Sequence, residues 1–426
     1  MHNRYSINLA WPSGQKSFEE EYRNWIKMCK EYNINYIRVF LVPWGLNPID
    51  SPKDLQLLCE VLQMAQRHSI EVVLVLDTYV NYVKYSYRDF LNSEYGWLNN
   101  PFSKDQSLDA FLEENGRTQY IERISSVLRT VTQYNNVNSI ELCNEIDQID
   151  ASRDQIVGWI NNSYGILLQE YGNRFGYRIS ISDYRAYSYY TKHIKCRCDI
   201  HSYRFPYNTA LENYEYLTNT CSTAWISEFA CFSDYAYADS VESLTYFYSM
   251  LICATFENCT VYPAPWWWEK ILLDTSYMNV YKYLDDFKGE FVKSKIEGFS
   301  IKEIKQINLS RDSKMQDKIR YRLSVLKRNP KFLKQELPAI TKYLRKKIWP
   351  QYNHKYAAIG FKSSNGILYI ILETYVPIEV LYETGDGLFR ILICQDMIRN
   401  MEKIPISVNE SRILKEGTYL LIIRNG

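Results

Sequence analysis

Short apolar runs alternate with amphipathic stretches along the first 290 residues. In the amphipathic stretches apolar residues recur every three or four positions, as helices require. One such stretch contains Tyr22, Trp25, Ile26 and Cys29. The strand-like runs span residues 5–11, 35–42, 70–77, 137–143, 177–182, 198–203, 223–229 and 259–265. Eight strands alternating with helices predict a (β/α)₈ TIM barrel, a fold of about 250 residues. An open doubly wound sheet would carry a Gly-rich phosphate loop after an early strand, and none is present.

The pattern changes near residue 298. Residues 298–349 are rich in Lys and Arg and mostly helical in periodicity, which fits either a solvated face or a contact with an anionic polymer. From residue 350 the pattern is that of short strands with a turn at Gly385-Asp386-Gly387. We therefore expect a catalytic barrel over 1–297, a basic connecting segment over 298–349 and a small all-β sandwich over 350–426.

The net charge is +1 over 426 residues, so no strong field draws the molecule to nucleic acid or to a membrane. No apolar segment reaches membrane-spanning length, and the N-terminus lacks the apolar core of a signal peptide. The ten cysteines fall mainly in apolar runs, as buried free thiols do. These features predict a cytoplasmic protein, or a secreted one if a leader has been removed.

Polar side chains gather where the predicted strands end, and in a barrel those carboxyl ends carry the catalytic groups. Glu145 closes the fourth strand and Glu228 the seventh, so the two face each other across the barrel mouth. A carboxylate is costly to bury without a partner. Glu228 stands where a partner for Glu145 is expected. Two carboxylates across a cleft are the groups that cleave glycosidic bonds.

Further residues at the strand ends make this pattern more specific. "IELCNEID" (140–147) is similar to the "WELWNEVD" motif of clan A retaining glycoside hydrolases, the cellulase-like barrels. In those families Asn-Glu ends strand four, His-x-Tyr ends strand six, Glu ends strand seven and Trp follows strand eight. "WLNNPF" (97–102) and "PWWWEKI" (265–271) resemble a bacterial branch with a small C-terminal β-sandwich.

The resemblance implies a role for each matching residue. Glu145 would be the acid/base and Glu228 the nucleophile of a retaining enzyme acting on a β-linked glycan. The residues expected to bind substrate or orient the acids are Arg38, Asn144, His201, Tyr203, Trp266, Trp267, Asp77 and Tyr79. Asp77 stands where many cellulases carry His, and Tyr79 begins a tyrosine-rich loop that either lines the cleft or packs. Asp147 either caps the following segment or reaches the site.

Other chemistries fit less well. A metal-dependent hydrolase on this fold needs an early His-x-His, and none of the five histidines is so spaced, so we expect no metal and no other cofactor. A Schiff-base aldolase needs a strand lysine, which the predicted strands lack. The partner is then a carbohydrate. A catalytically silent carbohydrate-binding barrel and a transglycosidase remain alternatives, and the oligomeric state is not predicted.

Overall fold

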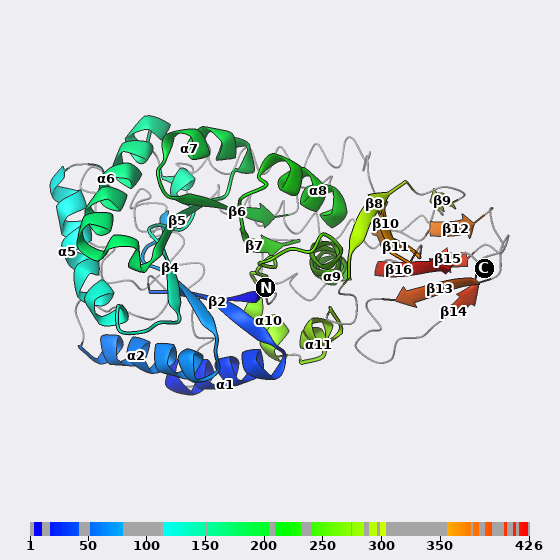
Figure 1. The fold of residues 1–426 in the computed structure, drawn as a ribbon, viewed down its shortest axis with the longest axis horizontal. Coiled ribbons are helices and arrows are strands. Elements are labelled where there is room, and N and C mark those ends of the chain that lie inside the picture. Colours follow the sequence, from blue (N-terminus) through cyan, green and yellow to red (C-terminus); the bar gives the residue numbers. More distant parts are fainter. Residues whose placement is uncertain are drawn as a thin grey trace, which may run out of the picture.

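The computed structural model covers the barrel strands, most of their helices and a C-terminal β-region (Figure 1). The described residues are 4–10, 18–41, 52–79, 112, 114–149, 151–203, 209–231, 241–273, 275–284, 289–295, 299–303, 356–365, 367–375, 378–382, 388–393, 404–406, 412–414 and 417–424. The loop after Tyr79, the predicted turn at 385–387 and nearly all of the basic segment lie outside them.

Seven parallel strands in sequential order form the barrel wall. They are β1 (Tyr5–Leu9), β2 (Ile34–Phe40), β3 (Glu71–Val75), β4 (Val137–Glu141), β5 (Gly176–Ile181), β6 (Arg197–Tyr203) and β7 (Ile226–Ala230). Six of them begin within one residue of the start of a predicted apolar run, and β7 begins three residues into its run. Because helices cover the outside of the wall, the residues that face them are largely apolar, whereas polar residues occur at the alternate positions.

The predicted eighth strand closes the barrel without forming a regular strand. Val261 bridges Arg4 beside β1, and Pro265 bridges Phe229 of β7, both in parallel. Pro263 and Pro265 have no N–H to donate, so a continuous hydrogen-bond ladder cannot form here. The (β/α)₈ barrel is confirmed, with its last strand reduced to isolated bridges.

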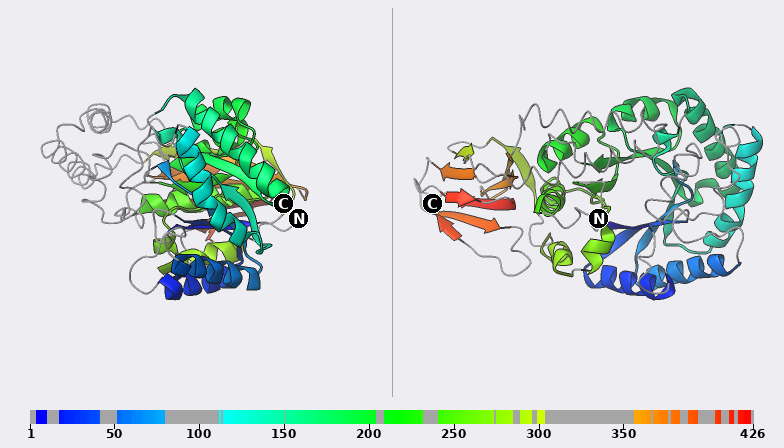
Figure 2. Two further views of the ribbon diagram at one scale, coloured as in Figure 1. Left: turned by 90° about the vertical axis from the view of Figure 1, so that its left-hand side faces the viewer. Right: turned by 180° about the vertical axis from the view of Figure 1, so that it is seen from behind.

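Helices pack around the outside of the wall (Figures 1 and 2). They are α1 (Phe18–Glu31), α2 (Pro52–Arg67), α5 (Glu114–Val131), α6 (Arg153–Tyr171), α7 (Tyr187–His193), α8 (Ala210–Thr220), α9 (Val241–Phe256), α10 (Trp268–Leu273) and α11 (Thr275–Leu284), with single 3₁₀ turns η3 (Ile146–Gln148), η4 (Gly172–Arg174) and η5 (Tyr184–Ala186). A large apolar cluster lies between strands and helices. None of the helices in this part of the chain combines the length and apolar character needed to cross a bilayer.

Two antiparallel sheets form the C-terminal region, as the predicted β-sandwich requires. The six-stranded sheet has the order β14-β13-β16-β11-β10-β8, and the three-stranded sheet the order β15-β12-β9. Their strands are β8 (Phe291–Ser294), β9 (Phe299–Glu303), β10 (Tyr356–Ser363), β11 (Leu368–Thr374), β12 (Ile378–Tyr382), β13 (Leu388–Ile393), β14 (Ile404–Ile406), β15 (Arg412–Leu414) and β16 (Gly417–Arg424).

Strands β8 and β9 lie upstream of the predicted sandwich and yet belong to its sheets. Residues 291–294 pair with β10, and residues 299–303 pair with β12. The domain limits stay a prediction, and the pairing of β8 favours a boundary before Phe291. The helical character predicted for 298–349 does not hold at 299–303, which are strand. Neighbour pairing decides the state of so short a segment more than its own composition.

A buried carboxylate joins the sandwich to the barrel. Glu373 of β11 is fully buried and accepts hydrogen bonds from the backbone N–H groups of Ala210 (2.8 Å) and Leu211 (2.9 Å) at the start of α8. A carboxylate at a helix N-terminus satisfies orphan donors and complements the helix dipole. The same interface contains a hydrogen bond between the hydroxyls of Thr418 on β16 and Ser249 on α9.

Candidate active site

Two polar layers fill the barrel lumen, because every second residue of a strand points inward. The upper layer, at the carboxyl ends, consists of Asn8, Arg38, Glu141, Asn144, Ser180, His201 and Glu228. The lower layer consists of Tyr36, Ser139, Arg178, Asp199 and Trp225. Four lower-layer residues stand two positions before an upper-layer residue on the same strand, as Arg178 does before Ser180. The site is thus the top of a packed, polar lumen.

Arg38 is the centre of the upper layer and is fully buried. Its Nε and Nη2 donate to the two oxygens of Glu141, each at 2.7 Å. Its Nη2 also donates to Asn144 Oδ1 at 2.6 Å, and its Nη1 donates to Glu228 Oε1 at 2.5 Å. Burial alone lowers the pKa of Arg38, but the charges of Glu141 and Glu228 outweigh it and raise the pKa. The guanidinium therefore keeps its charge.

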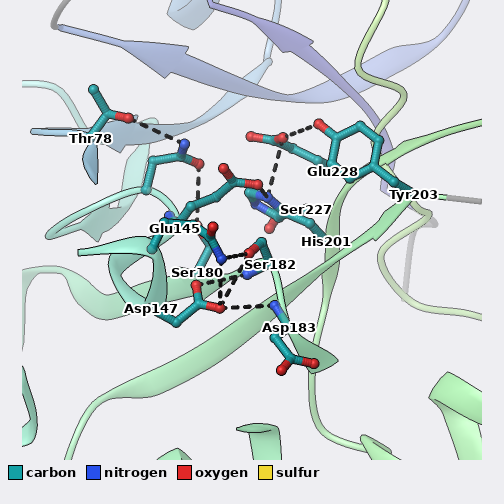
Figure 3. A network of polar contacts seen from close by, with 12 residues as sticks. Thr78, Glu145, Asp147, Ser180, Ser182, Asp183, His201, Tyr203, Ser227 and Glu228 are labelled. Carbon is teal, nitrogen blue, oxygen red and sulfur yellow. Dashed lines mark hydrogen bonds and ion pairs between the residues drawn. The ribbon is translucent and has the colours of Figure 1, made fainter. Parts of the chain in front are cut away.

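Glu228, on β7, has both carboxylate oxygens engaged, and Figure 3 shows the contact with Tyr203. Besides Arg38 on Oε1, the Tyr203 hydroxyl donates to Oε2 at 2.6 Å. Burial, helped by the charge of Glu145, raises the pKa of Glu228, and the opposing effects of His201, Arg38 and the Tyr203 hydrogen bond do not cancel this rise. Burial also raises the pKa of Tyr203 well above its ordinary value, so this phenol stays a donor.

Glu145 follows β4 in a left-handed backbone conformation, with φ of 51°. This region costs a non-glycine residue about 1–2 kcal/mol, so the surroundings must hold it there. The backbone N–H of Glu145 donates to Ser180 Oγ at 3.1 Å. Burial, helped by the charges of Asp147 and Glu141, raises the pKa of the Glu145 carboxyl to about 8. Near neutral pH this acid therefore holds a proton.

His201 lies between the two acids in Figure 3. Its Nδ1 is 2.8 Å from Glu145 Oε1 and 3.2 Å from Glu228 Oε2. Burial lowers the pKa of His201, so the ring is neutral with one proton. We assign that proton to Nδ1, the nitrogen that faces acceptors, because Nε2 has no hydrogen-bond partner among the described residues.

Asp147 links the loop after β4 to the loop after β5. Its carboxylate accepts hydrogen bonds from the backbone N–H groups of Ser182 and Asp183, each at 2.9 Å. It thus fixes the two loops that flank Glu145, and its charge helps to raise the pKa of Glu145. Of the two predictions for Asp147, the structure favours a role in holding a segment, although the segment follows β5 instead of β4.

The tryptophans after the barrel closure divide by exposure. Trp268 is fully buried in the core, whereas Trp266 and Trp267 are partly exposed. Trp266 packs edge-on against Phe40 at the end of β2, with ring centroids 6.0 Å apart. Phe40 in turn lies under the Arg38 guanidinium, so Trp266 is linked to the upper layer through one ring, and its role as a platform stays a prediction.

Asp77 and Tyr79 follow β3 at the same end of the barrel. Asp77 is fully buried and accepts a hydrogen bond from the Thr78 backbone N–H at 2.9 Å. Tyr79 is partly buried and packs against the apolar cluster outside the strands. The Thr78 hydroxyl lies 3.4 Å from Asn144 Nδ2. These contacts support the β3–β4 junction, and the roles of Asp77 and Tyr79 toward a substrate remain predictions.

Sequence analysis missed Asn8, Glu141 and Ser180, which complete the upper layer. Asn8 accepts a hydrogen bond from Arg38 and donates to the backbone oxygens of Ser227 and Pro265, each at 3.0 Å, which ties β1 to β7 and to the closing segment. Glu141 and Ser180 lie inside apolar strands at positions that alternate with apolar ones. A polar residue at an inward position of a buried strand is the signal that could have found them.

Glu145, His201 and Glu228 each present a ligand atom, all within 4.8 Å of one another. Among the described residues, these three side chains form a cluster of the residue types that can bind a metal ion. A hydrogen-bonded arrangement explains the same geometry, because Nδ1–H of a neutral imidazole faces two carboxyl groups. The cluster therefore does not require an ion.

Comparison with solved structures finds several similar ones. A glycoside hydrolase family 5 protein from Bacteroides vulgatus matches with a TM-score of 0.52 at 11% identity, covering 100% of this chain and 89% of that one. The family 30 subfamily 8 xylanase Xyn30A from Clostridium acetobutylicum matches at 0.46 and 10% identity, over 99% and 96%. The GH5_18 protein from Streptomyces cattleya in complex with GlcNAc matches at 0.46 and 13%, over 62% and 70%.

No family model and no curated protein matches the sequence. The similarity to the Bacteroides vulgatus structure extends over the barrel and the sandwich, so the architecture expected from the clan A resemblance is confirmed. At this identity the likeness establishes the fold, and the chemistry has to be argued from the residues of the upper layer.

Proposed function

We propose that this protein is a retaining glycoside hydrolase that cleaves a β-linked oligo- or polysaccharide by double displacement. The observation that carries the proposal is the asymmetry of the acid pair. Glu145 and Glu228 each have a carboxylate oxygen within 4.8 Å of the other, yet Glu228 faces a cation and a phenol while Glu145 has a pKa near 8. Retaining enzymes hold their carboxyl groups about 5–5.5 Å apart, and inverting ones about 6.5–9.5 Å apart.

In the first step Glu228 attacks the anomeric carbon and forms a glycosyl ester, while the bond to the leaving oxygen breaks. Glu145 donates its proton to that oxygen and becomes a carboxylate. Arg38 and Tyr203 hold Glu228 in place before the attack. Afterwards they remain as hydrogen-bond donors to the oxygens of the glycosyl ester.

In the second step the ionised Glu145 takes a proton from a water molecule, whose oxygen attacks the anomeric carbon. The ester bond breaks, Glu228 leaves as a carboxylate, and Glu145 is protonated again. Two inversions give net retention of configuration. His201, hydrogen-bonded to Glu145, keeps this carboxyl oriented in both protonation states.

Residues around Glu145 and Glu228 bind the sugar. Asn144, held by Arg38 at 2.6 Å, has the amide suited to hydrogen-bond a 2-hydroxyl. Trp266 and Trp267 offer partly exposed rings on which the apolar face of a sugar stacks. Asp77 and Tyr79 lie at the same end of the barrel, after β3, and we propose that they support the substrate-binding surface from beneath.

Two single substitutions test this assignment. Glu228→Ala removes the nucleophile and should abolish turnover of aryl β-glycosides. Glu145→Ala should retain turnover of a dinitrophenyl β-glycoside, whose leaving group needs no proton. Azide should accelerate the Glu145→Ala variant, and the product should be a β-glycosyl azide, identified by proton NMR.

The matched control is Glu141→Ala, which removes a buried acid of the same layer that is not placed to attack or to protonate. Azide should not rescue it. Full activity in either Glu145→Ala or Glu228→Ala, or an α-configured azide product, would show that this pair does not perform a retaining reaction.

A further inference from the structure

Glu141 is a buried acid that the proposed reaction does not consume. It is fully buried on β4, four residues before Glu145, and both of its oxygens are engaged. Oε2 accepts from Arg38 Nε at 2.7 Å, and Oε1 accepts from Arg38 Nη2 at 2.7 Å and from the Ser180 hydroxyl at 2.6 Å. A carboxylate is costly to bury, so a position with three charge-assisted or short hydrogen bonds calls for an explanation.

One side of Glu141 determines where Arg38 points. A guanidinium is planar, so the two hydrogen bonds that Glu141 accepts from Nε and Nη2 fix the plane of the whole group. The remaining nitrogen, Nη1, is then aimed at Glu228, which it reaches at 2.5 Å. Without this grip Arg38 keeps its charge but can rotate about its side-chain bonds. The orientation of Glu228 therefore depends on Glu141.

The other side of Glu141 determines how the Ser180 hydroxyl is turned. A hydroxyl has one proton and two lone pairs, and here the proton is directed to Glu141. A lone pair of Ser180 Oγ is then available to the backbone N–H of Glu145 at 3.1 Å. That hydrogen bond holds Glu145 in its left-handed conformation. The main chain of Glu145 therefore depends on Glu141 as well.

We propose that Glu141 is a positioning residue that serves both acids at once, holding Glu228 through Arg38 and the backbone of Glu145 through Ser180. This inference rests on the proposed function, because it takes its meaning from the roles of the two acids. The charge of Glu141 adds a second effect. It raises the pKa of Glu145, after burial and Asp147, so it helps to keep the acid/base protonated.

The test compares Glu141→Gln with Asp199→Asn. Both replace a buried carboxylate that pairs with a buried arginine at 2.7 Å, but Asp199 lies in the lower layer and contacts neither acid. The readout is the pKa of Glu145, followed by carbon NMR of glutamate-labelled protein without substrate and assigned with Glu145→Gln. Besides Glu141, the charged or titratable groups that face Glu145 among the described residues are Asp147, Arg38, His201, Tyr203 and Glu228.

We expect the pKa of Glu145 to fall by about one to two pH units in Glu141→Gln, since one negative charge several ångströms away is removed. It should stay within about 0.3 units in Asp199→Asn, which leaves all of those groups in place. Glu141→Asp, which keeps the charge but shortens the reach, should leave the pKa near the wild-type value. An unchanged pKa in Glu141→Gln would overturn the electrostatic part of the inference, whether or not the wild type cleaves any glycoside.

A milder pair tests the backbone part if the buried-charge variants do not fold. Ser180→Ala removes the acceptor of the Glu145 N–H, and Ser139→Ala removes a serine of the lower layer that accepts from Arg178 at 2.9 Å. The amide of Glu145 should exchange with deuterium at least about tenfold faster in Ser180→Ala than in Ser139→Ala, the loss expected for a hydrogen bond of about 1.4 kcal/mol. Equal exchange would overturn this part.

Activity then separates the inference from the proposed function. With the aryl β-glycoside that the wild type cleaves, kcat/KM should fall by about 100-fold in Glu141→Gln and Glu141→Asp, because both misalign Arg38. In Asp199→Asn, kcat/KM corrected for the folded fraction should stay within threefold of the wild-type value. A wild type that cleaves no glycoside refutes the proposed function, whereas active Glu141 variants refute the positioning role alone.

Discussion

The two layers of the barrel lumen contain nearly the same chemistry and differ in what it touches. Each has a buried arginine paired with a buried carboxylate at 2.7 Å: Arg38–Glu141 above and Arg178–Asp199 below. In the lower layer the remaining contacts go to Ser139 and to the ring of Trp225. In the upper layer Arg38 continues to Glu228 and Asn144. A buried ion pair is thus not in itself a sign of a site, and the third contact of the arginine distinguishes the two.

The largest effect should come from removing each arginine. Arg38→Ala and Arg178→Ala both leave a carboxylate buried without its partner, so we expect each to lower the free energy of unfolding by about 3–5 kcal/mol. Activity should separate them. Arg38→Ala should lose about 1000-fold in kcat/KM, as loss of a preorganised donor at a reacting group does, while folded Arg178→Ala should stay near the wild type.

Denaturant unfolding and kinetics on an aryl β-glycoside, corrected for the folded fraction, provide the two measurements. Equal losses of activity in both variants would mean that the layers do not differ in function.

Trp225 of the lower layer and Trp266, which packs on Phe40 beside the upper layer, sharpen the comparison. Trp225 is buried below, where Tyr36 packs on it at 5.1 Å, and Trp266 is partly exposed above. Trp225→Ala should cost about 3–5 kcal/mol of stability without changing the affinity of the folded protein for a glycan. Trp266→Ala should weaken glycan binding by at least tenfold with a smaller loss of stability.

Isothermal titration with the preferred oligosaccharide and thermal unfolding of both variants would check this pair. A bound sugar found away from residues 266–268 in a crystal structure would contradict the platform assignment.

Removal of a single hydroxyl should have a smaller effect than removal of Arg38. Tyr203→Phe removes the donor on Glu228 Oε2 and leaves Arg38 on Oε1. We expect kcat to fall by about 100-fold, in line with other single donors at a developing or departing charge. KM should change little, since the hydroxyl is engaged with the protein. Steady-state kinetics of the variant give both values, and a change confined to KM would assign Tyr203 to substrate binding instead.

The smallest expected effect is the pH dependence of kcat/KM, which is measured on the wild-type protein. Glu145 must be protonated to act as the acid, and its pKa is about 8, so kcat/KM should fall about tenfold per pH unit as pH rises above that value. A dinitrophenyl glycoside, whose leaving group needs no proton, should lose this basic limb. The pH–rate profiles of the two substrates decide it. A basic limb of the same position for both would point to a group other than Glu145.

The strand pattern predicted the barrel and the strand ends predicted most of the site, because both follow from local rules. Apolar runs of strand length define the wall, and parallel strands bring their ends to one rim. The acids Glu145 and Glu228, with Arg38, His201 and Tyr203, were placed in this way, and the structure brings these five together. Their catalytic roles remain proposals.

What sequence analysis could not supply depends on contacts between distant segments. In the sequence Glu141 is an isolated acid in an apolar strand, and its partner Arg38 lies 103 residues earlier. Ser180 is unremarkable in sequence because its role is an acceptor for a backbone N–H. Strand β8 is too short and exposed to show a strand pattern, and it exists because β10 pairs with it.

The contact of Glu373 with α8 has a consequence for how the chain is made. The carboxylate follows the N–H groups that it accepts from by 163 and 162 residues. At about 5–20 residues per second of synthesis, the first turn of α8 waits roughly 8–33 s for it. During that interval the Thr209 side chain, which accepts from the Glu212 N–H, caps the helix, while the N–H groups of Ala210 and Leu211 face water. The face of the barrel formed by α8 and α9 is therefore completed only after β11 and β16 have been synthesised.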